Sequence, residues 1–134
     1  MTNHNSRRRN VSSGAPWETI HGYSRAVRIG PHIAVSGTAP VGPGGEALGG
    51  ADMYLQAVNC LEIIEAALQK SGASLDDVIR TRVFTTDISQ WEAIARAHNE
   101  FFAAVRPAST LLEVSRLISP ALLVEIEADA ICED

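Results

Sequence analysis

Residues 122–131, LLVEIEADAI, alternate apolar and acidic side chains and decide the fold. Side chains of a β-strand point alternately to its two faces, so this stretch predicts a strand with one apolar and one acidic face. The apolar face needs a covering layer of helices, and the acids on the other face repel one another unless cations, hydrogen bonds or solvent compensate them. That acidic face is either functional or simply solvated. The apolar face holds Val124, Ile126, Ala128 and Ala130, and the acidic face holds Glu125, Glu127 and Asp129.

Two helical patterns precede this strand and supply the covering layer. Apolar residues recur at spacings of three and four after Asp52, a predicted N-cap, and the pattern stops before Gly72. A second helix follows Ser89 and ends at Pro107, because proline cannot continue a helix. The apolar stripes consist of Leu55, Val58, Leu61, Ile64, Ala67 and Leu68 in the first helix, and of Trp91, Ile94, Ala97, His98 and Phe101 in the second.

Five further segments have the character of strands, namely residues 17–20, 24–29, 32–38, 78–86 and 109–117. β-Branched residues and alternation favour this assignment, and glycines and prolines mark the turns between the segments. The predicted order is β-β-β-α-β-α-β-β, an α+β domain with two helices packed on one face of an antiparallel or mixed sheet. Residues 40–50, with five glycines and two prolines, form a surface loop.

Length, composition and charge narrow the function classes. The 134 residues, 46% of them apolar, fit one domain with a real core. Residues 1–14 are polar and are predicted to be a disordered tail before a domain at 15–134. The net charge is −5, and because Arg7, Arg8 and Arg9 lie in this acid-free tail, the rest of the chain carries −8. This negative charge disfavours nucleic acid as a partner. The three arginines are either part of a solvated tail or a weak contact for nucleic acid or a membrane.

Targeting segments, metal sites and disulfides have no support in the sequence. No apolar run approaches the roughly 20 residues that cross a bilayer, and the amino terminus lacks the apolar core of a signal peptide, so we expect a cytoplasmic protein. Cys60 and Cys132 have no CxxC spacing, which predicts reduced thiols. No histidine has a ligand spacing to the acids of 122–131, so no metal is predicted.

Five segments in register resemble the signatures of the reactive intermediate deaminase family, RidA/YjgF. In chain order they are GYSRAV (22–27), VSGT (35–38), GASLDDVIRTRVFTTD (72–87), RPAST (106–110) and LVEIEA (123–128). Their order and spacing match across residues 22–131. The resemblance implies a chorismate-mutase-like α+β fold and a homotrimer, with the sheets facing inward and three small-molecule clefts between subunits. It also implies hydrolysis of reactive enamines and imines to 2-keto acids and ammonia, without a metal or cofactor.

The resemblance also implies roles for individual residues. Tyr23 matches a tyrosine that lines the cleft, and Glu125 matches a glutamate that positions or activates the attacking water. Ser36 and Thr38 lie in a segment near the cleft, where they either bind substrate or are satisfied strand hydroxyls. The family arginine that binds the substrate carboxylate is absent, because its position holds Ser109, which makes this chain a divergent member.

Two arginines are candidates to replace the missing one. Arg25 either faces the cleft, where it pairs with Glu125 or a ligand carboxylate, or forms a simple ion pair with an acid. Arg106 is either a second anion partner or a surface residue at a helix end. His98 is either a core or interface residue or a catalytic one. The predicted function is that of a RidA-like small-molecule-binding protein and possible imine deaminase, and the alternative is a non-catalytic ligand-binding or scaffold trimer.

Overall fold

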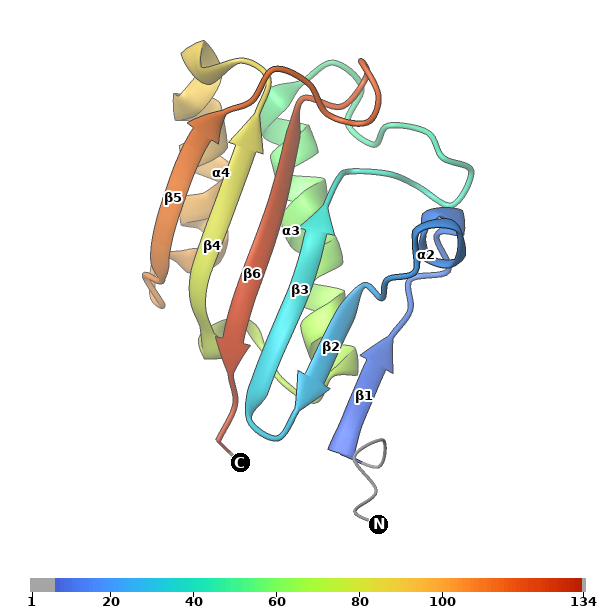
Figure 1. Cartoon of the computed structure of the whole chain (residues 1–134). Helices are drawn as coiled ribbons and strands as arrows, with labels where there is room; N and C mark the ends of the chain where they lie inside the picture. Colours follow the sequence, from blue (N-terminus) through green and yellow to red (C-terminus); the bar gives the residue numbers. More distant parts are fainter. Residues whose placement is uncertain (1–6, 134) are drawn as a thin grey trace.

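Six strands form one sheet at the centre of the fold in a computed structural model that describes residues 7–133. The strands are β1 (Arg8–Val11), β2 (Ala26–Ile29), β3 (His32–Thr38), β4 (Val78–Thr85), β5 (Ala108–Glu113) and β6 (Val124–Ile131). Their order across the sheet is β1-β2-β3-β6-β4-β5 (Figure 1). All neighbours are antiparallel except β4 and β5, which are parallel. The predicted mixed sheet is therefore confirmed.

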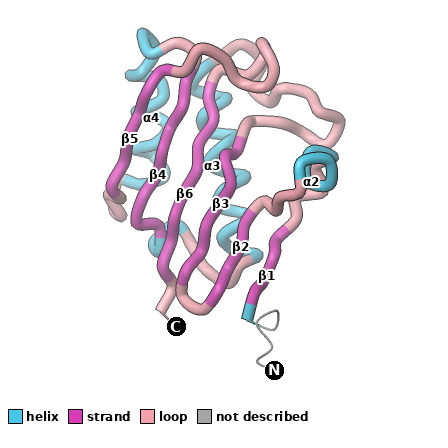
Figure 2. Tube along the Cα trace, in the orientation of Figure 1, coloured by secondary structure: helices cyan, strands magenta, loops and turns pink. Residues whose placement is uncertain are grey.

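Two long helices, α3 (Met53–Lys70) and α4 (Trp91–Phe102), cover one face of this sheet and leave the other open (Figures 1 and 2). The apolar side of β6 packs beneath them, with Val124 and Ile126 fully buried against helix residues such as Leu61 and Ile64. Burial along β6 alternates residue by residue, as its sequence predicts. A short helix, α2 (Pro16–His21), and two 3-10 turns, η1 (Leu75–Asp77) and η2 (Ile88–Gln90), complete the fold.

The ends of α3 follow the predicted signals. The Asp52 carboxylate accepts a hydrogen bond from the Leu55 N–H at 2.9 Å, and Gly72 follows the helix in the left-handed conformation at φ 83°. In α4, however, Trp91 is 51% exposed, and Phe102 rather than Phe101 is the buried aromatic ring. Trp91 is the first residue of the helix and lies over a groove instead of the core. Among residues 7–133, no helix combines the length and the hydropathy that spanning a bilayer requires.

The prediction of a disordered tail is wrong over residues 8–11, which form β1 and pair with β2. A sheet edge carries unpaired backbone groups, and β1 satisfies those of β2 whatever its side chains are. Val11 is buried, and the Arg9 guanidinium donates to the Lys70 carbonyl at 3.1 Å, where a helix C-terminus favours cations. The domain thus begins before residue 15, and residues 1–6 of the predicted tail lie outside the described part.

The predicted strand at residues 17–20 is also wrong, because this segment belongs to α2. Pro16 pre-sets the first turn, and Gly22 ends the helix at φ 84°, with its N–H bonded to the Glu18 carbonyl at 2.9 Å. Four residues are too few to separate a period of 2 from one of 3.6. The described part of the chain still contains six strands, since β1 takes the place of the strand predicted here.

A buried glutamine ties α3 to two loops at one end of the sheet. The Gln56 Nε2 donates to the carbonyls of Gly50 at 2.7 Å and Ala121 at 2.9 Å, and its Oε1 accepts the Leu123 N–H at 2.8 Å. Gln56 is fully buried, so its amide replaces water as the partner of all three backbone groups. This clamp fixes the segment that leads into β6.

Candidate functional site

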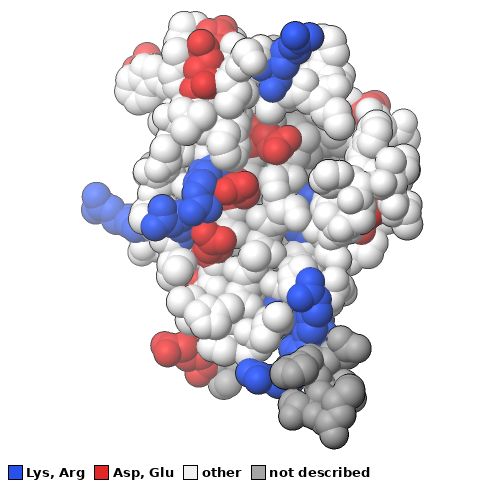
Figure 3. Space-filling model, viewed as in Figure 1, with Lys and Arg blue, Asp and Glu red and all other residues white. Residues whose placement is uncertain are grey.

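The open face of the sheet carries acids and arginines side by side (Figure 3). The Arg82 Nη1 lies 3.0 Å from Glu127 Oε1 and 3.2 Å from Asp129 Oδ2. Arg82 is the cross-strand neighbour of Glu127, so the register of β4 against β6 creates this pairing. One arginine therefore compensates two of the three acids of β6. Glu125, the third acid, takes no part in this ion-pair group.

The Glu125 carboxylate lies against the backbone of Gly37 in β3. A Cβ at position 37 would collide with Oε2, so the missing side chain of Gly37 makes the room for this carboxylate. The pairing of β3 with β6 shifts register between Val35 and Thr38, at the position of Gly37. Among the described residues, the carboxylate has no hydrogen bond or ion pair. Burial raises the pKa of Glu125, and the nearby charge of Arg25 offsets part of this increase.

Arg25 completes a group that we call the Glu125 cluster (Tyr23, Arg25, Gly37 and Glu125). The Arg25 side chain is buried, donates from Nη2 to the Gly37 carbonyl at 3.0 Å, and lies 5.5 Å from the centre of the Tyr23 ring. Its Nε is buried without a partner among the described residues. The structure thus brings three predicted site residues together, although Arg25 and Glu125 interact through their charges and not through a direct ion pair.

Ser36 and Thr38 act as satisfied strand hydroxyls. The Ser36 hydroxyl donates to the Ser24 carbonyl at 2.6 Å, and the Thr38 hydroxyl donates to the Ser36 carbonyl at 2.7 Å. Thr38 is fully buried opposite Ile126 and points into the core, away from the Glu125 carboxylate. In this chain, the Thr38 side chain therefore lies on the core side of β3 and not on the face that carries Glu125.

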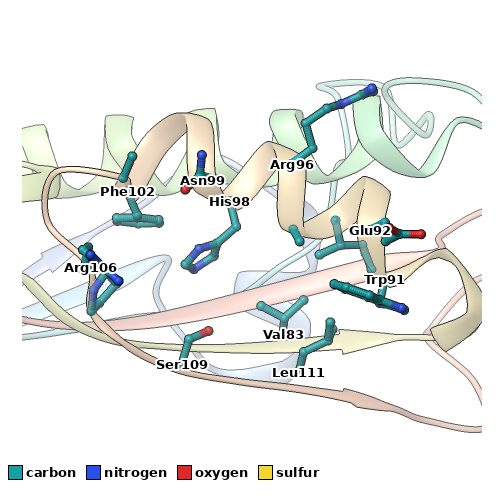
Figure 4. Close-up of a pocket in the computed structure, with 14 residues that line it drawn as sticks. Val83, Trp91, Glu92, Arg96, His98, Asn99, Phe102, Arg106, Ser109 and Leu111 are labelled. Carbon is teal, nitrogen blue, oxygen red and sulfur yellow. The ribbon is translucent and has the colours of Figure 1, made fainter.

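Ser109 lies elsewhere, in a groove of about 650 Å³ between α4 and strands β4 and β5 (Figure 4). Its apolar walls include Val83, Ile94, Phe102 and Leu111. Figure 4 shows Trp91 and Glu92 at one end of this Ser109 groove and Arg106 at the other, with His98 pointing from α4 toward Ser109. The remaining lining residues are Ala95, Arg96, Asn99, Ala103 and Pro107.

A hydrogen-bonded chain forms the floor of the groove. The Thr81 Oγ1 lies 2.8 Å from the Ser109 Oγ and 2.8 Å from the His98 Nε2. Thr81 is fully buried, whereas Ser109 is exposed to the groove. Burial lowers the pKa of His98, whose ring packs on Phe102 with 4.7 Å between ring centres. Sequence reasoning did not identify Thr81 as a site residue, because its contact with Ser109 depends on the parallel register of β4 and β5.

Arg106 borders the groove in an unusual conformation. It is the single residue other than glycine with a positive φ, 55°, among residues 7–133, and its N–H closes the end of α4 on the Phe102 carbonyl at 2.8 Å. Its guanidinium makes no hydrogen bond or ion pair with a described residue. Two arginines are candidates to replace the family's carboxylate-binding arginine. Arg106 lines the same groove as Ser109, whereas Arg25 lies near Glu125.

One chain does not bring all predicted site residues together. Ser109 points to the helix side of the sheet with its neighbour Thr81, whereas Glu125 points to the open face. The Ser109 groove and the Glu125 cluster thus lie on opposite sides of the sheet within one chain. Within residues 7–133, no three His, Cys, Asp or Glu side chains are placed to hold a metal ion.

The role of Gly37 leads to a first prediction. In Gly37→Ala, the new methyl group displaces the Glu125 carboxylate toward solvent, and the pKa of Glu125 moves back toward its ordinary value because burial raises it in the wild type. NMR titration of the Glu125 side chain measures this shift. Gly42→Ala is the matched control, since its Cβ would lie 2.6 Å from the Glu46 Oε2 in the distant loop. An unchanged pKa of Glu125 in Gly37→Ala would contradict the assignment.

Comparison with known proteins identifies the family. The family model Endoribonuclease L-PSP matches residues 13–132. The crystal structure of Rv2704 from Mycobacterium tuberculosis, a member of the YjgF/YER057c/UK114 family, superposes with a TM-score of 0.85 at 47% sequence identity, over 92% of this chain and 98% of that chain. The chain belongs to the YjgF/RidA family.

Two further relatives match most of the chain, and one of them is named as a deaminase. The uncharacterized protein SCO2049 of Streptomyces coelicolor is 38% identical over 122 residues, which cover 91% of this chain and 90% of the relative. The 2-iminobutanoate/2-iminopropanoate deaminase of Salmonella typhimurium is 31% identical over 112 residues, covering 81% and 86%. The predicted family and its α+β fold are therefore confirmed.

Proposed function

We propose that this protein binds a small organic molecule and hydrolyses enamines or imines to carbonyl compounds and ammonia. The observation that carries the proposal is the Glu125 carboxylate, which is partly buried, fits against Gly37 and has no partner among the described residues. A carboxylate in this state is available to hold a water molecule and accept its proton. The name of the deaminase relative from Salmonella typhimurium supports the reaction class.

In the proposed reaction, Glu125 accepts a proton from water while the water oxygen bonds to the imine carbon. This proton then passes to the nitrogen, which gives a carbinolamine. Glu125 next moves the carbinolamine hydroxyl proton to the nitrogen as the C–N bond breaks, so ammonia leaves and the carbonyl forms. Tyr23 and Arg25 shape the pocket around this carboxylate. No cofactor is needed for these steps, because water and a proton acceptor balance the reaction.

We place the complete site between subunits of a homotrimer. A Ser109 groove and a Glu125 cluster on opposite sides of the sheet meet only if the open face of one subunit lies near the groove of another. The open sheet face and the buried Arg25 Nε, which has no hydrogen-bond partner within residues 7–133, support this arrangement. Light scattering after gel filtration tests it, and a monomer at micromolar concentration would contradict the shared site.

The alternative function is a non-catalytic ligand-binding or scaffold trimer. Ser109 favours it, because a single neutral hydroxyl cannot form the bidentate ion pair that an arginine makes with a carboxylate. A nuclease function, which the name of the family model suggests, has less support, because a net charge of −5 disfavours a polyanion. The same reasoning leaves nucleic acid outside the proposed partners, and we propose a cytoplasmic location.

The variant Ser109→Arg separates the enzyme from the scaffold. If the remaining site is intact, the guanidinium supplies the missing ion pair, and hydrolysis of freshly generated 2-imino acids rises by about 30-fold, the equivalent of a charge-pair interaction of about 2 kcal/mol. Ammonia release measures the rate. Ser109→Gln is the control, since it adds length without charge. No gain in Ser109→Arg, with a folded protein, would favour the scaffold.

A further inference from the structure

The floor of the Ser109 groove is a continuous set of hydrogen bonds that we call the hydroxyl relay (Ser109, Thr81 and His98). Both of its links measure 2.8 Å between heavy atoms. Thr81, in the middle, is fully buried and has one hydroxyl hydrogen to share between two neighbours. The hydrogen-bond direction at one end of the relay therefore fixes the direction at the other.

This geometry gives two matched states. When Thr81 donates to Ser109, it accepts from the Nε2–H of His98, and the Ser109 hydrogen is free to point into the groove. When Ser109 donates to Thr81, Thr81 donates to the Nε2 lone pair, and Ser109 accepts from a ligand. A neutral imidazole supports both states, because its hydrogen can lie on either nitrogen. Burial favours this neutral form by lowering the pKa of His98.

Charge is confined to the rim of the groove. The relay and the walls formed by Val83 and Phe102 are uncharged, whereas Glu92, Arg96 and Arg106 are exposed at the edge. The Arg96 guanidinium lies 4.0 Å from the centre of the Tyr54 ring on α3, outside the floor. A ligand group that reaches Ser109 thus meets apolar walls and neutral hydrogen-bonding groups, among them the Ser109 hydroxyl. Burying a carboxylate there without a charged partner is costly.

We propose that Ser109, held by Thr81 and His98, selects ligands with an uncharged carbonyl, amide or hydroxyl group at this point, and an apolar body along the groove. Thr81 and His98 are positioning residues. The proposal rests on the proposed function for its substrate class, which becomes imines that carry an uncharged polar group instead of a carboxylate. Because the preference concerns binding, ligand affinities can test it in the absence of any reaction.

Phenylacetamide and phenylacetate are matched probes, because they share a ring and differ in the charge of one group. We expect wild-type protein to bind the amide at least about five-fold more tightly, the equivalent of one neutral hydrogen bond. Ser109→Ala and Thr81→Val remove the end and the middle of the relay and weaken amide binding by about five-fold to ten-fold. Thr81→Ser keeps the hydroxyl and restores amide binding to within about twofold of wild type.

A spectroscopic signal distinguishes positioning from a structural role. Amide binding should shift the ¹⁵N resonances of the His98 ring in wild type and Thr81→Ser, and leave them unchanged in Ser109→Ala. Ser109 is exposed, so its alanine variant retains the fold even if Thr81→Val does not. Thermal melting of each variant confirms folding.

Three results would overturn the inference. Tighter binding of phenylacetate that is lost in Arg106→Gln would assign ligand selection to the rim arginine. Equal weakening of both probes in Ser109→Ala would remove the preference for uncharged groups, as would binding of neither probe to wild type. The expected amide preference without imine hydrolysis would support the inference and contradict the proposed function.

Discussion

Glu125→Gln is expected to lower imine hydrolysis by about 100-fold or more, the usual contribution of a positioned proton acceptor. Glutamine has nearly the same shape, so it still fits against Gly37, but its amide cannot take a proton from water. Ammonia release from freshly generated imines measures the loss. Glu127→Gln is the matched control, because it neutralises an acid of the same strand that is paired with Arg82. An equal loss in both variants would show that the charge of the face matters and not Glu125.

The pH dependence of the rate tests the same assignment. Because burial raises the pKa of Glu125, the rate should increase with pH along a limb that lies above the ordinary range of a glutamate. Arg25→Gln should move this limb to still higher pH, since the Arg25 charge lowers the pKa of Glu125. A limb at an ordinary glutamate pKa in both proteins would contradict the buried carboxylate.

Glu125→Gln is expected to lower activity without lowering the stability of the fold at neutral pH. A group whose pKa is raised in the folded protein stabilises it below the ordinary pKa, and this contribution is lost as pH rises through the raised value. Glu125→Gln removes the burial of a charge, so the variant should unfold no more easily than wild type at neutral pH. Denaturation midpoints at pH 4 and pH 7.5 compare the two proteins, and a large loss of stability in the variant at pH 7.5 would contradict this sign.

Gln56→Leu is expected to destabilise the fold by about 3 kcal/mol and to lower Tm by about 10 °C. Leucine fills similar space but leaves the Leu123 N–H and the carbonyls of Gly50 and Ala121 buried without partners. Chemical denaturation at a fixed protein concentration measures the loss, because an oligomer's stability depends on concentration.

Gln69→Leu is the matched control for this substitution. Gln69 belongs to the same helix, its side chain is exposed, and we expect a change within about 0.5 kcal/mol. Equal effects of the two substitutions would show that the three buried hydrogen bonds of Gln56 contribute nothing specific.

The strict alternation of residues 124–131 made the two faces of β6 predictable, because a period of 2 over eight residues has no helical alternative. The same reasoning failed at Trp17, where the pattern covered four residues and Pro16 and Gly22 set a helix instead. β1 was not predicted, because three of its four residues are polar and exposed. As an edge strand, it is held by backbone hydrogen bonds more than by apolar side chains.

The sequence suggested residues for the candidate site, but it did not indicate how they are arranged in space. Arg25 lies near both Tyr23 and Glu125, but Gly37 makes room for the carboxylate at a register shift that no sequence period reveals. Thr81 and Ser109 lie 28 residues apart and meet through the parallel pairing of β4 and β5. Tertiary placement of this kind depends on the whole sheet.

The position of β6 determines when the sheet can be completed. It follows every other described strand in sequence, yet it lies between β3 and β4 at the middle of the sheet. Without β6, β3 and β4 would each lack a neighbour on the edge that β6 fills. The sheet therefore cannot be completed until residues 124–131 have been synthesised, because β6 is the strand that joins β3 to β4.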